Sequence, residues 1–575
     1  MPAPEPDQDD DALSALVASG AFGTRTGVHK AVPLTLVQGV VQLIDSTHIV
    51  TTASAWRAKD RTTTGRGGRR PLLNDRAVIA LMLIAAIDQT PLLATRLAAL
   101  ADQLQPEAKQ LLGIPATLTD ESYAAVWRAI HRFLKLIDPY PISRYTITPR
   151  DEYEQRVAEL DPALIVERRA RLDMMANMIV QSAYRALLDR KTRRKWEGNV
   201  ALDATYLPVP SHAMFDGRTT DHQAGWYSRT AETHSPFDEK GRRRKDSKFG
   251  YELTVAIQTA NDPHTAADFP LLALGVTFEK PAATPALLGL IALKAVSELG
   301  MPVGKFIADR NYSPSQKQHK FQIPVTLMGY QTVCDFKVDQ LGIKRGHRGA
   351  NQIEGSWYCP SMPEPLVNAT IDWRNKTIDL ATFQARIKQR RAYKLKAKEL
   401  PAANGSQPLM CPAVGPGATA ACPLKPDSQI GPNVATRVRI RPPDKPDAIC
   451  TNATSVSFPI TAGAKYGQHF DFMSQEWKDW YGLRSTVESF NAYIKDTNYE
   501  AAGSADRRRI RGLPAQYIFL AISVLAANIR KIRTWVLGRP VNPQKRITRR
   551  QRQAAAKQAQ ENTLAPYANS PPVAA

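Results

Sequence analysis

Two strand-like segments that each carry an aspartate after an apolar tripeptide constrain the fold of this chain most strongly. Residues 200–207 contain Asp203 and residues 305–312 contain Asp309, and both segments have the composition of β-strands. An aspartate is disfavoured within a strand unless another interaction compensates for it. Each aspartate alone is most simply a strand-ending or turn residue, so a shared role requires a third partner.

Residues 480–495 supply that partner, because they predict a helix with two distinct stripes. At about 100° per residue, Tyr481, Arg484, Glu488 and Lys495 fall within about 60° of one another. The apolar residues of the neighbouring arc are Leu483, Val487, Phe490 and Ile494. A surface helix with a weak Arg484–Glu488 ion pair would explain only two of the four polar residues.

This spacing resembles the signature of bacterial DDE transposases of the insertion-sequence-four type, which carry Tyr, then Arg three residues on, Glu four further and Lys seven further. Four residues match it without a gap: Tyr481, Arg484, Glu488 and Lys495. In that family one aspartate lies on the first strand of an RNase H-like sheet and another at the end of the fourth. Asp203 and Asp309 are the matching residues, and the resemblance covers roughly residues 196–535.

The resemblance implies an α/β fold with an RNase H-like mixed sheet flanked by helices, interrupted by a mainly β insertion and preceded by an N-terminal all-α domain. Asp203, Asp309 and Glu488 are then the catalytic residues and the ligands of two Mg²⁺ ions, for which Mn²⁺ can substitute. Hard cations prefer carboxylate oxygens as ligands. A pair of such cations stabilises both the attacking and the leaving oxygen at phosphorus.

The remaining residues of the helix are expected to bind DNA. Lys495 would contact a phosphate as a point charge, and Tyr481 could donate a hydrogen bond to the DNA backbone. Arg484 either binds a phosphate or orients Glu488, and the sequence favours neither role.

The charge of the chain agrees with a DNA partner. The 575 residues carry a net charge of +22, which is the footprint of a polyanion-binding protein. A single basic run is usually a solvated surface, but five runs in one chain favour binding to a phosphate backbone. These runs are residues 242–245, 388–391, 437–441, 507–511 and 545–552.

The sequence also predicts where the protein works. Five cysteines in 575 residues indicate a reducing compartment, and the acidic first residues do not have the pattern of a signal peptide. The longest apolar stretch, residues 517–527, is too short to span a bilayer and predicts a buried helix. We therefore expect a cytoplasmic bacterial protein with no membrane partner, associated with the nucleoid when bound to DNA.

Seven segments are expected along the chain. They are a disordered tail (1–30), a helical DNA-end-binding domain (31–140), a helical linker (141–195), the first part of the catalytic core (196–330), a β-rich insertion (331–470), the second part of the core with the glutamate helix (471–540) and a basic disordered tail (541–575). Helices predicted at 75–88, 91–104 and 120–136 could form either a helix-turn-helix-like DNA reader or a plain bundle. Residues 66–71 have the composition of a short minor-groove arm.

Four of the five cysteines, Cys359, Cys411, Cys422 and Cys450, lie within the expected insertion, and three of them precede a proline. Their spacing is irregular and contains no Cys-x2-Cys pair, which favours small buried thiols. A loop-rich insertion has little core of its own, however, so a structural Zn²⁺ held by the four thiolates is the alternative, with His347 as a substitute ligand.

These observations predict a DDE transposase that cleaves the ends of an insertion sequence and joins them to target DNA. Its partners would be double-stranded DNA, both the terminal inverted repeats and the target, and a second copy of the chain in the DNA complex. Two alternatives stay open: an endonuclease that does not join DNA, and a catalytically silent DNA-binding regulator derived from a transposase.

Overall fold

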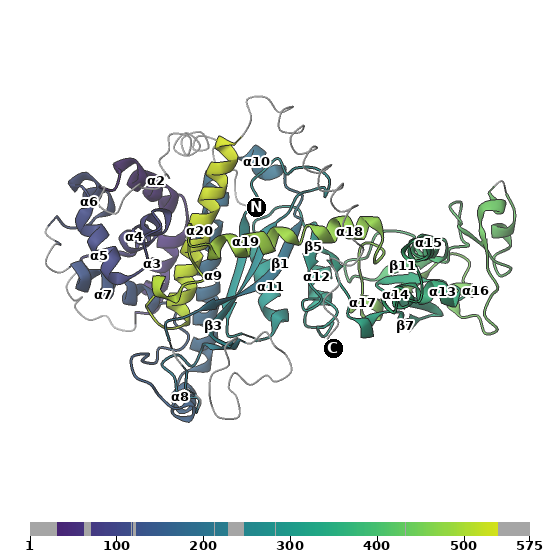
Figure 1. Cartoon of the computed structure of the whole chain (residues 1–575), viewed down its shortest axis with the longest axis horizontal. Helices are drawn as coiled ribbons and strands as arrows, with labels where there is room; N and C mark the ends of the chain where they lie inside the picture. Colours follow the sequence, from purple (N-terminus) through teal and green to yellow (C-terminus); the bar gives the residue numbers. More distant parts are fainter. Residues whose placement is uncertain are drawn as a thin grey trace.

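The computed structural model describes residues 31–61, 71–116, 118, 122–211, 213–214, 216–227, 247–281, 283–431 and 433–538. The two predicted tails, residues 66–70 of the proposed arm at 66–71, and the basic runs 242–245 and 545–552 lie outside these residues. The described chain is a mixed α/β protein, in which a twisted mixed sheet is flanked by helices (Figure 1). Helices gather at one end of the sheet, and a region of short elements extends from the other end. The prediction of an α/β fold with a mixed, helix-flanked sheet is confirmed.

The central sheet has the strand order β2-β3-β1-β5-β6, with β4 also paired to β3. β1 runs antiparallel to β3 and parallel to β5, and β5 is parallel to β6. The bounds are β1 Val200–Pro208, β2 Gly225–Tyr227, β3 Lys248–Gln258, β4 Ala273–Glu279, β5 Lys305–Ala308 and β6 Gln331–Cys334. The sequence did not predict the three-residue β2.

The second aspartate-bearing strand is shorter than expected. Residues 305–312 were predicted to be extended, but β5 ends at Ala308 and the chain turns. The backbone N–H of Asn311 donates to the Asp309 carboxylate at 2.8 Å, and that of Tyr312 donates to the Asp309 carbonyl at 3.2 Å. Aspartate stabilises such turns through its side chain, so the strand ends at the residue before Asp309.

Two long helices cover the sheet and close the free side of β4. They are α9 (Pro162–Leu187) and α20 (Leu513–Leu537), and a third helix, α11 (Pro285–Ser297), also packs on β4. Asn177 of α9 exchanges two hydrogen bonds with the backbone of Val276, and Asn528 of α20 does the same with Ala273. These amides replace a neighbouring strand, so the edge of the sheet is not left with unpaired backbone groups.

Within the described residues, α20 is the one helix long and apolar enough to cross a membrane. Its apolar window is entirely buried against the rest of the protein. This burial agrees with the sequence expectation of a buried helix at 517–527, and it gives α20 the character of a core helix.

The N-terminal helices pack around one central helix, α4. Twelve of its thirteen residues are buried, and Asn74 caps it by accepting the backbone N–H of Ala77 at 2.7 Å. The helices of this region are α2 (Leu34–Asp45), α3 (Ile49–Lys59), α4 (Asp75–Ile87), α5 (Ala94–Gln103), α6 (Pro106–Leu112) and α7 (Ser122–Leu134). α4 also packs on α20, and the helices share one continuous apolar core with the sheet.

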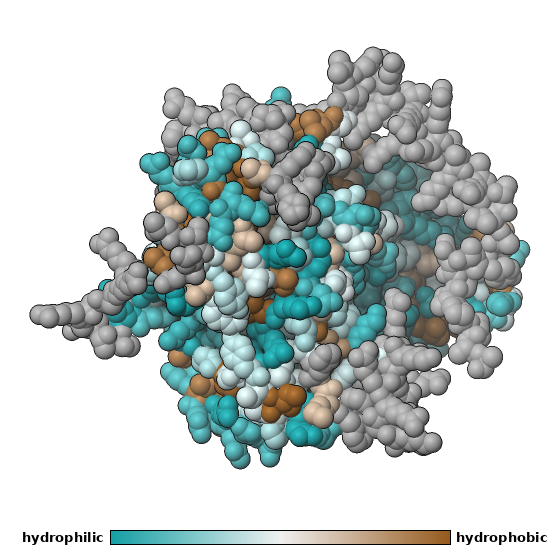
Figure 2. Space-filling view, turned by 60° about the vertical axis from the view of Figure 1, so that its left-hand side comes forward, coloured by the Kyte–Doolittle hydropathy of each residue, from teal (hydrophilic) through white to brown (hydrophobic). Residues whose placement is uncertain are grey.

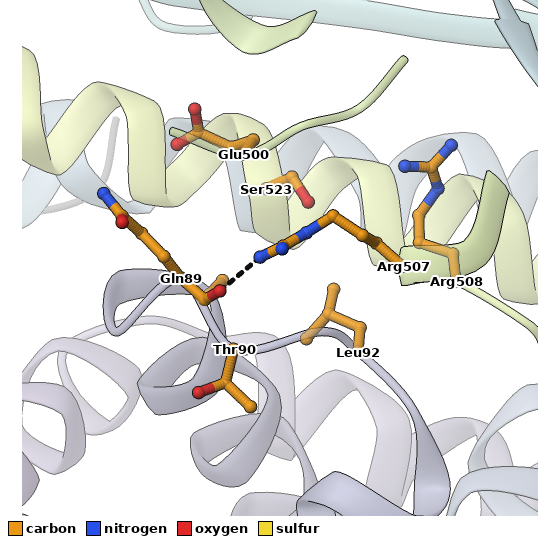
Figure 3. Close-up of a pocket in the computed structure, with 8 residues that line it drawn as sticks. Gln89, Thr90, Leu92, Glu500, Arg507, Arg508 and Ser523 are labelled. Carbon is orange, nitrogen blue, oxygen red and sulfur yellow. Dashed lines mark hydrogen bonds between the residues drawn. The ribbon is translucent and has the colours of Figure 1, made fainter. Parts of the chain in front are cut away.

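A polar junction joins these helices to the segment that follows the glutamate helix (Figure 3). Gln89 has a left-handed backbone with φ 59° and accepts a hydrogen bond from the Arg507 guanidinium through its carbonyl. Its side-chain amide donates to the carbonyl of Asn498 at 2.9 Å.

On the face of the molecule shown in Figure 2, hydrophobic residues stand in separate small groups rather than in one broad patch.

Three further helices lie in the chain between the N-terminal helices and β1: α8 (Arg150–Ala158), α9 and α10 (Arg190–Arg194). They occupy the region expected to be a helical linker. α8 has no buried residue, whereas the second half of α9 belongs to the core.

The insertion between β6 and the glutamate helix is mixed rather than mainly β, which corrects the prediction. Its strands have two to five residues and are β7 (Ile343–His347), β8 (Ala350–Ile353), β9 (Ser356–Tyr358), β10 (Lys396–Ala397), β11 (Gln407–Met410), β12 (Ala420–Ala421), β13 (Val438–Arg439) and β14 (Val456–Phe458). Its helices are α13 (Glu364–Val367), α14 (Ala369–Arg374), α15 (Leu380–Arg390), α16 (Ala448–Thr451) and α17 (Ile460–Gly463), whereas α12 (Gln322–Leu327) lies just before β6. The longest, α15, has an N-cap at Asp379, a start signal that the sequence interpretation passed over.

Replacement of the β4 edge contact should destabilise the protein. Asn528→Leu keeps the side-chain size but leaves the N–H and carbonyl of Ala273 without partners in a buried place, which costs about 3 kcal/mol of unfolding free energy. Equilibrium denaturant unfolding measures the loss. The exposed Asn433→Leu is the matched control, and an equal effect of both variants would contradict the assigned role of Asn528.

Candidate active site

The strand register places the two predicted aspartates side by side. In the parallel pair β1–β5, Leu202 lies opposite Ala308, so the next residues, Asp203 and Asp309, occupy matching positions. Neighbouring strands lie about 4.8 Å apart. Two carboxylates that are 106 positions apart in the sequence therefore lie close enough to interact, since Asp309 helps to raise the pKa of Asp203.

The glutamate helix is two helices in close succession. α18 (Gln475–Gly482) and α19 (Ser485–Lys495) are separated at Leu483 and Arg484, where the hydrogen bonds tighten to an i to i+3 pattern. Gly482 weakens a helix at this point because its backbone is freer than that of other residues. α19 packs across β1 and β3, which brings Glu488 to the strand that carries Asp203.

Arg484 links the glutamate to the first aspartate. Its Nη1 lies 2.7 Å from Oε1 of Glu488, and its Nη2 lies 3.9 Å from Oδ2 of Asp203. Burial lowers the pKa of Arg484, but the groups of Tyr481, Asp203, Glu488 and Asp309 outweigh it, so the pKa lies above its ordinary value. These ion pairs place Arg484 where it can orient Glu488, which is one of the two roles left open by the sequence.

The three carboxylates share one electrostatic environment. Burial raises the pKa of Asp203 to about 6; Arg484 and the backbone N–H of Ala204 oppose this shift, and Asp309 and Glu488 add to it. Within the described residues, no three His, Cys, Asp or Glu side chains already stand at positions that could hold a metal ion. The Glu488 side chain is 52% exposed, so it is free to approach the aspartates when a cation offsets their repulsion.

Tyr481 and Lys495 lie on either side of Glu488 along the helices. Tyr481 stacks on Trp477, with ring centroids 4.7 Å apart, and burial raises its pKa, so its hydroxyl stays protonated. Lys495 is the last residue of α19, about 10 Å along the axis from Glu488. Glu488 and Lys495 thus share α19, whereas Tyr481 belongs to α18.

The sequence interpretation missed a third aspartate of the sheet, Asp335. β5 and β6 are parallel with Ala308 opposite Cys334, so Asp309 and Asp335 again occupy matching positions. The Asp335 carboxylate lies 3.8 Å from Nη2 of Arg374 in the insertion. The signal was available, because Val333 and Cys334 precede Asp335 as an apolar segment precedes Asp309, but this segment was assigned to the insertion.

Comparison of the chain with protein-family models, with curated proteins and with solved structures found no match. The interpretation of the site therefore depends on the residues and their geometry.

The raised pKa of Asp203 predicts a pH-dependent cost of folding in the metal-free protein. A carboxyl whose pKa rises from 3.8 to about 6 on folding contributes stability that is present below pH 3.8 and is lost as the pH rises through about 6. Asp203→Asn should remove this dependence. Between pH 4 and pH 7, the unfolding free energy of the variant should rise by about 3 kcal/mol relative to that of the native chain, because a pKa shift of about two units corresponds to that free energy.

Chemical unfolding in the presence of EDTA at a series of pH values tests this expectation. The exposed Asp506→Asn serves as the control for a general effect of removing a negative charge. A constant difference in stability between Asp203→Asn and the native chain from pH 4 to pH 7 would contradict the buried, charge-coupled position of Asp203.

Proposed function

We propose that this protein is a DDE transposase, which cleaves DNA at the ends of an insertion sequence and joins them to target DNA with the help of divalent metal ions. The observation that carries the proposal is the placement of Asp203 beside Asp309, with Glu488 held toward them by Arg484. The Tyr, Arg, Glu and Lys spacing around Glu488 supports the same assignment.

The order of the elements supports an RNase H-like core. If the short β2 is set aside, three antiparallel strands are followed by a helix and a parallel fourth strand. Asp203 lies on the first of these strands and Asp309 directly after the fourth. Both positions are those that the resemblance implies for the catalytic aspartates.

The carboxylates suit a pair of Mg²⁺ ions, because hard cations prefer carboxylate oxygens, and a cation would offset the cost of ionising Asp203, whose pKa is raised mainly by burial and further by Asp309 and Glu488. Asp203, Asp309 and Glu488 would be the ligands, and the ions would supply charge stabilisation at the attacking and leaving oxygens. Arg484 holds Glu488 toward Asp203, and Lys495 lies far enough along α19 to contact the neighbouring phosphate. Hydrolysis by water and attack by the freed 3′-hydroxyl use one site, since both are in-line displacements at phosphorus.

The protein surface supports a DNA partner for this site. The net charge of +22 favours binding to a phosphate backbone, and the exposed Arg310 directly follows Asp309. The same proposal includes double-stranded DNA as both the ends of the element and the target. It also includes a second copy of the chain in the DNA complex and association with the nucleoid.

Glu488→Gln should separate chemistry from binding. The change removes a metal ligand without changing side-chain size, so Mg²⁺-dependent nicking should fall on the order of 10³-fold or more, as the loss of transition-state charge stabilisation does. Affinity for DNA should change less than about threefold, because the basic surface is intact. Gel assays on a duplex that carries the sequences flanking the coding region measure both quantities.

The matched control is Glu476→Gln, an exposed glutamate on α18 that pairs with Arg391. Nicking by Glu488→Gln at the native rate would exclude the metal-ligand role. A strand-transfer assay with pre-cleaved ends then distinguishes a transposase from an endonuclease that does not join DNA.

Lys495→Ala should instead weaken DNA binding and cleavage together. The loss of one phosphate contact reduces the slope of log affinity against log salt concentration by about one. Lys294→Ala, an exposed lysine on α11, is the control for charge alone. An unchanged salt slope for Lys495→Ala, or an equal reduction in both variants, would contradict a phosphate contact at Lys495.

A further inference from the structure

The insertion lacks a core large enough to explain its order. Val333, Phe336 and Leu341 at its start belong to the main core, but its other clustered apolar residues form three small clusters apart from that core. Its strands have two to five residues, and long loops join them. Regions of this kind are usually stabilised by a cross-link or a metal ion, because the apolar area that they bury does not offset the entropy of ordering the chain.

Four cysteines come from four different segments of this insertion. Cys359 follows β9, Cys411 follows β11, Cys422 follows β12, and Cys450 lies in α16. All four are buried, and none forms a disulfide. The first three belong to one apolar cluster, and Cys450 belongs to the next.

Three of these cysteines begin the same kind of turn. Each is followed by proline, and its carbonyl accepts the backbone N–H three residues on: Met362 to Cys359 at 3.1 Å, Val414 to Cys411 at 3.0 Å and Lys425 to Cys422 at 2.9 Å. The backbone N–H groups of Ser361 and Ala413 also donate to the sulfurs of Cys359 and Cys411. Such donors stabilise a thiolate more than a thiol.

Hydrogen bonds outside the sulfurs connect the four segments. The backbone N–H of Cys359 donates to the Tyr393 carbonyl at 2.9 Å, and the hydroxyl of Thr419 donates to the adjacent Ala392 carbonyl at 2.9 Å. The backbone N–H of Thr419 donates to the carbonyl of Pro412, next to Cys411, at 2.9 Å. Lys425, in the Cys422 turn, donates to the carbonyl of Asn452 at the end of α16.

The thiols are close enough to influence one another. Burial raises the pKa of Cys359 to about 12; the N–H of Ser361 opposes this, and Cys411, Cys450 and Cys422 add to it. Burial and then Cys411 and Cys422 raise the pKa of Cys450 to about 11. Each of the four therefore lies within electrostatic range of the other three.

We propose that Cys359, Cys411, Cys422 and Cys450 bind one structural Zn²⁺ that cross-links the insertion. Four soft sulfur ligands suit tetrahedral zinc, and the two apolar clusters around them exclude competing hard cations. No three ligand-type side chains of the described chain already stand at coordinating positions, so the four sulfurs, which the turns and hydrogen bonds bring into one region, would have to move closer together to bind the ion. His347 is not part of the set, because its ring packs on Phe458 and its Nε2 lies 3.3 Å from the Ser457 carbonyl.

Metal analysis of the full chain, purified without a metal-binding tag, tests the proposal directly. We expect about one zinc per chain, and after exchange with Co²⁺ we expect the thiolate-to-metal and d–d absorption of a tetrahedral sulfur site. Removal of zinc by a chelator should lower the melting temperature and expose the insertion to proteases, and zinc should restore both. These readouts do not involve DNA, so their failure would leave the proposed transposase function untouched.

Single Cys→Ser variants locate the ion. Cys411→Ser and Cys450→Ser should each reduce bound zinc at least tenfold, whereas Cys334→Ser, the buried fifth cysteine on β6, should retain the native zinc content. If a variant fails to fold, the zinc content and the cobalt spectrum of the native chain decide. Zinc-free protein whose stability does not respond to added zinc, equal zinc in all variants, or stoichiometric iron in place of zinc would each overturn the proposal.

Discussion

The parallel pairing of β1 with β5 is the constraint on which the candidate site depends. Leu202 pairs with Ala308, and this register, together with the turn that begins at Asp309, brings the two aspartates near each other. A slip of one residue would turn one carboxylate to the other face of the sheet. The apolar residues before each aspartate are fully buried, so the core that fixes the register also fixes the spacing of the charges.

Placing carboxylates together has an electrostatic cost, and Arg484 partly offsets it. Its guanidinium contacts both Asp203 and Glu488, yet the pKa of Asp203 remains raised to about 6. Burial is the main cause of this shift and Asp309 and Glu488 add to it, so Arg484 does not fully offset the cost of an ionised Asp203. A divalent cation would stabilise the ionised form further, and Asp335 follows the end of β6 as Asp309 follows the end of β5.

The insertion and the N-terminal helices are joined to the core in different ways. The helices share the core through α4 and α20, and the Gln89 junction connects them to the segment after α19. The insertion instead has small clusters of its own, with the buried Glu354–Arg390 ion pair as one internal link. A region built in this way depends on specific cross-links, for which its four gathered thiols are the best-placed groups.

Local sequence patterns were sufficient to predict much of this protein. The apolar segment at 200–207 predicted β1, the helix expected at 75–88 corresponds to α4, and the spacing of Tyr481, Arg484 and Glu488 predicted a helix with a polar stripe. These features depend on residues close together in the chain, whose periodicity and capping are visible in the sequence.

Other features required the tertiary structure, because they depend on contacts between distant residues. The turn after Ala308, the two-part glutamate helix and the mixed character of the insertion were each mispredicted or missed, since short segments with proline and glycine fit several local structures. The position of Asp335 follows from the pairing of β5 with β6. The sequence determined which residues carry charge and thiol groups, and strand register and packing determined which of them meet.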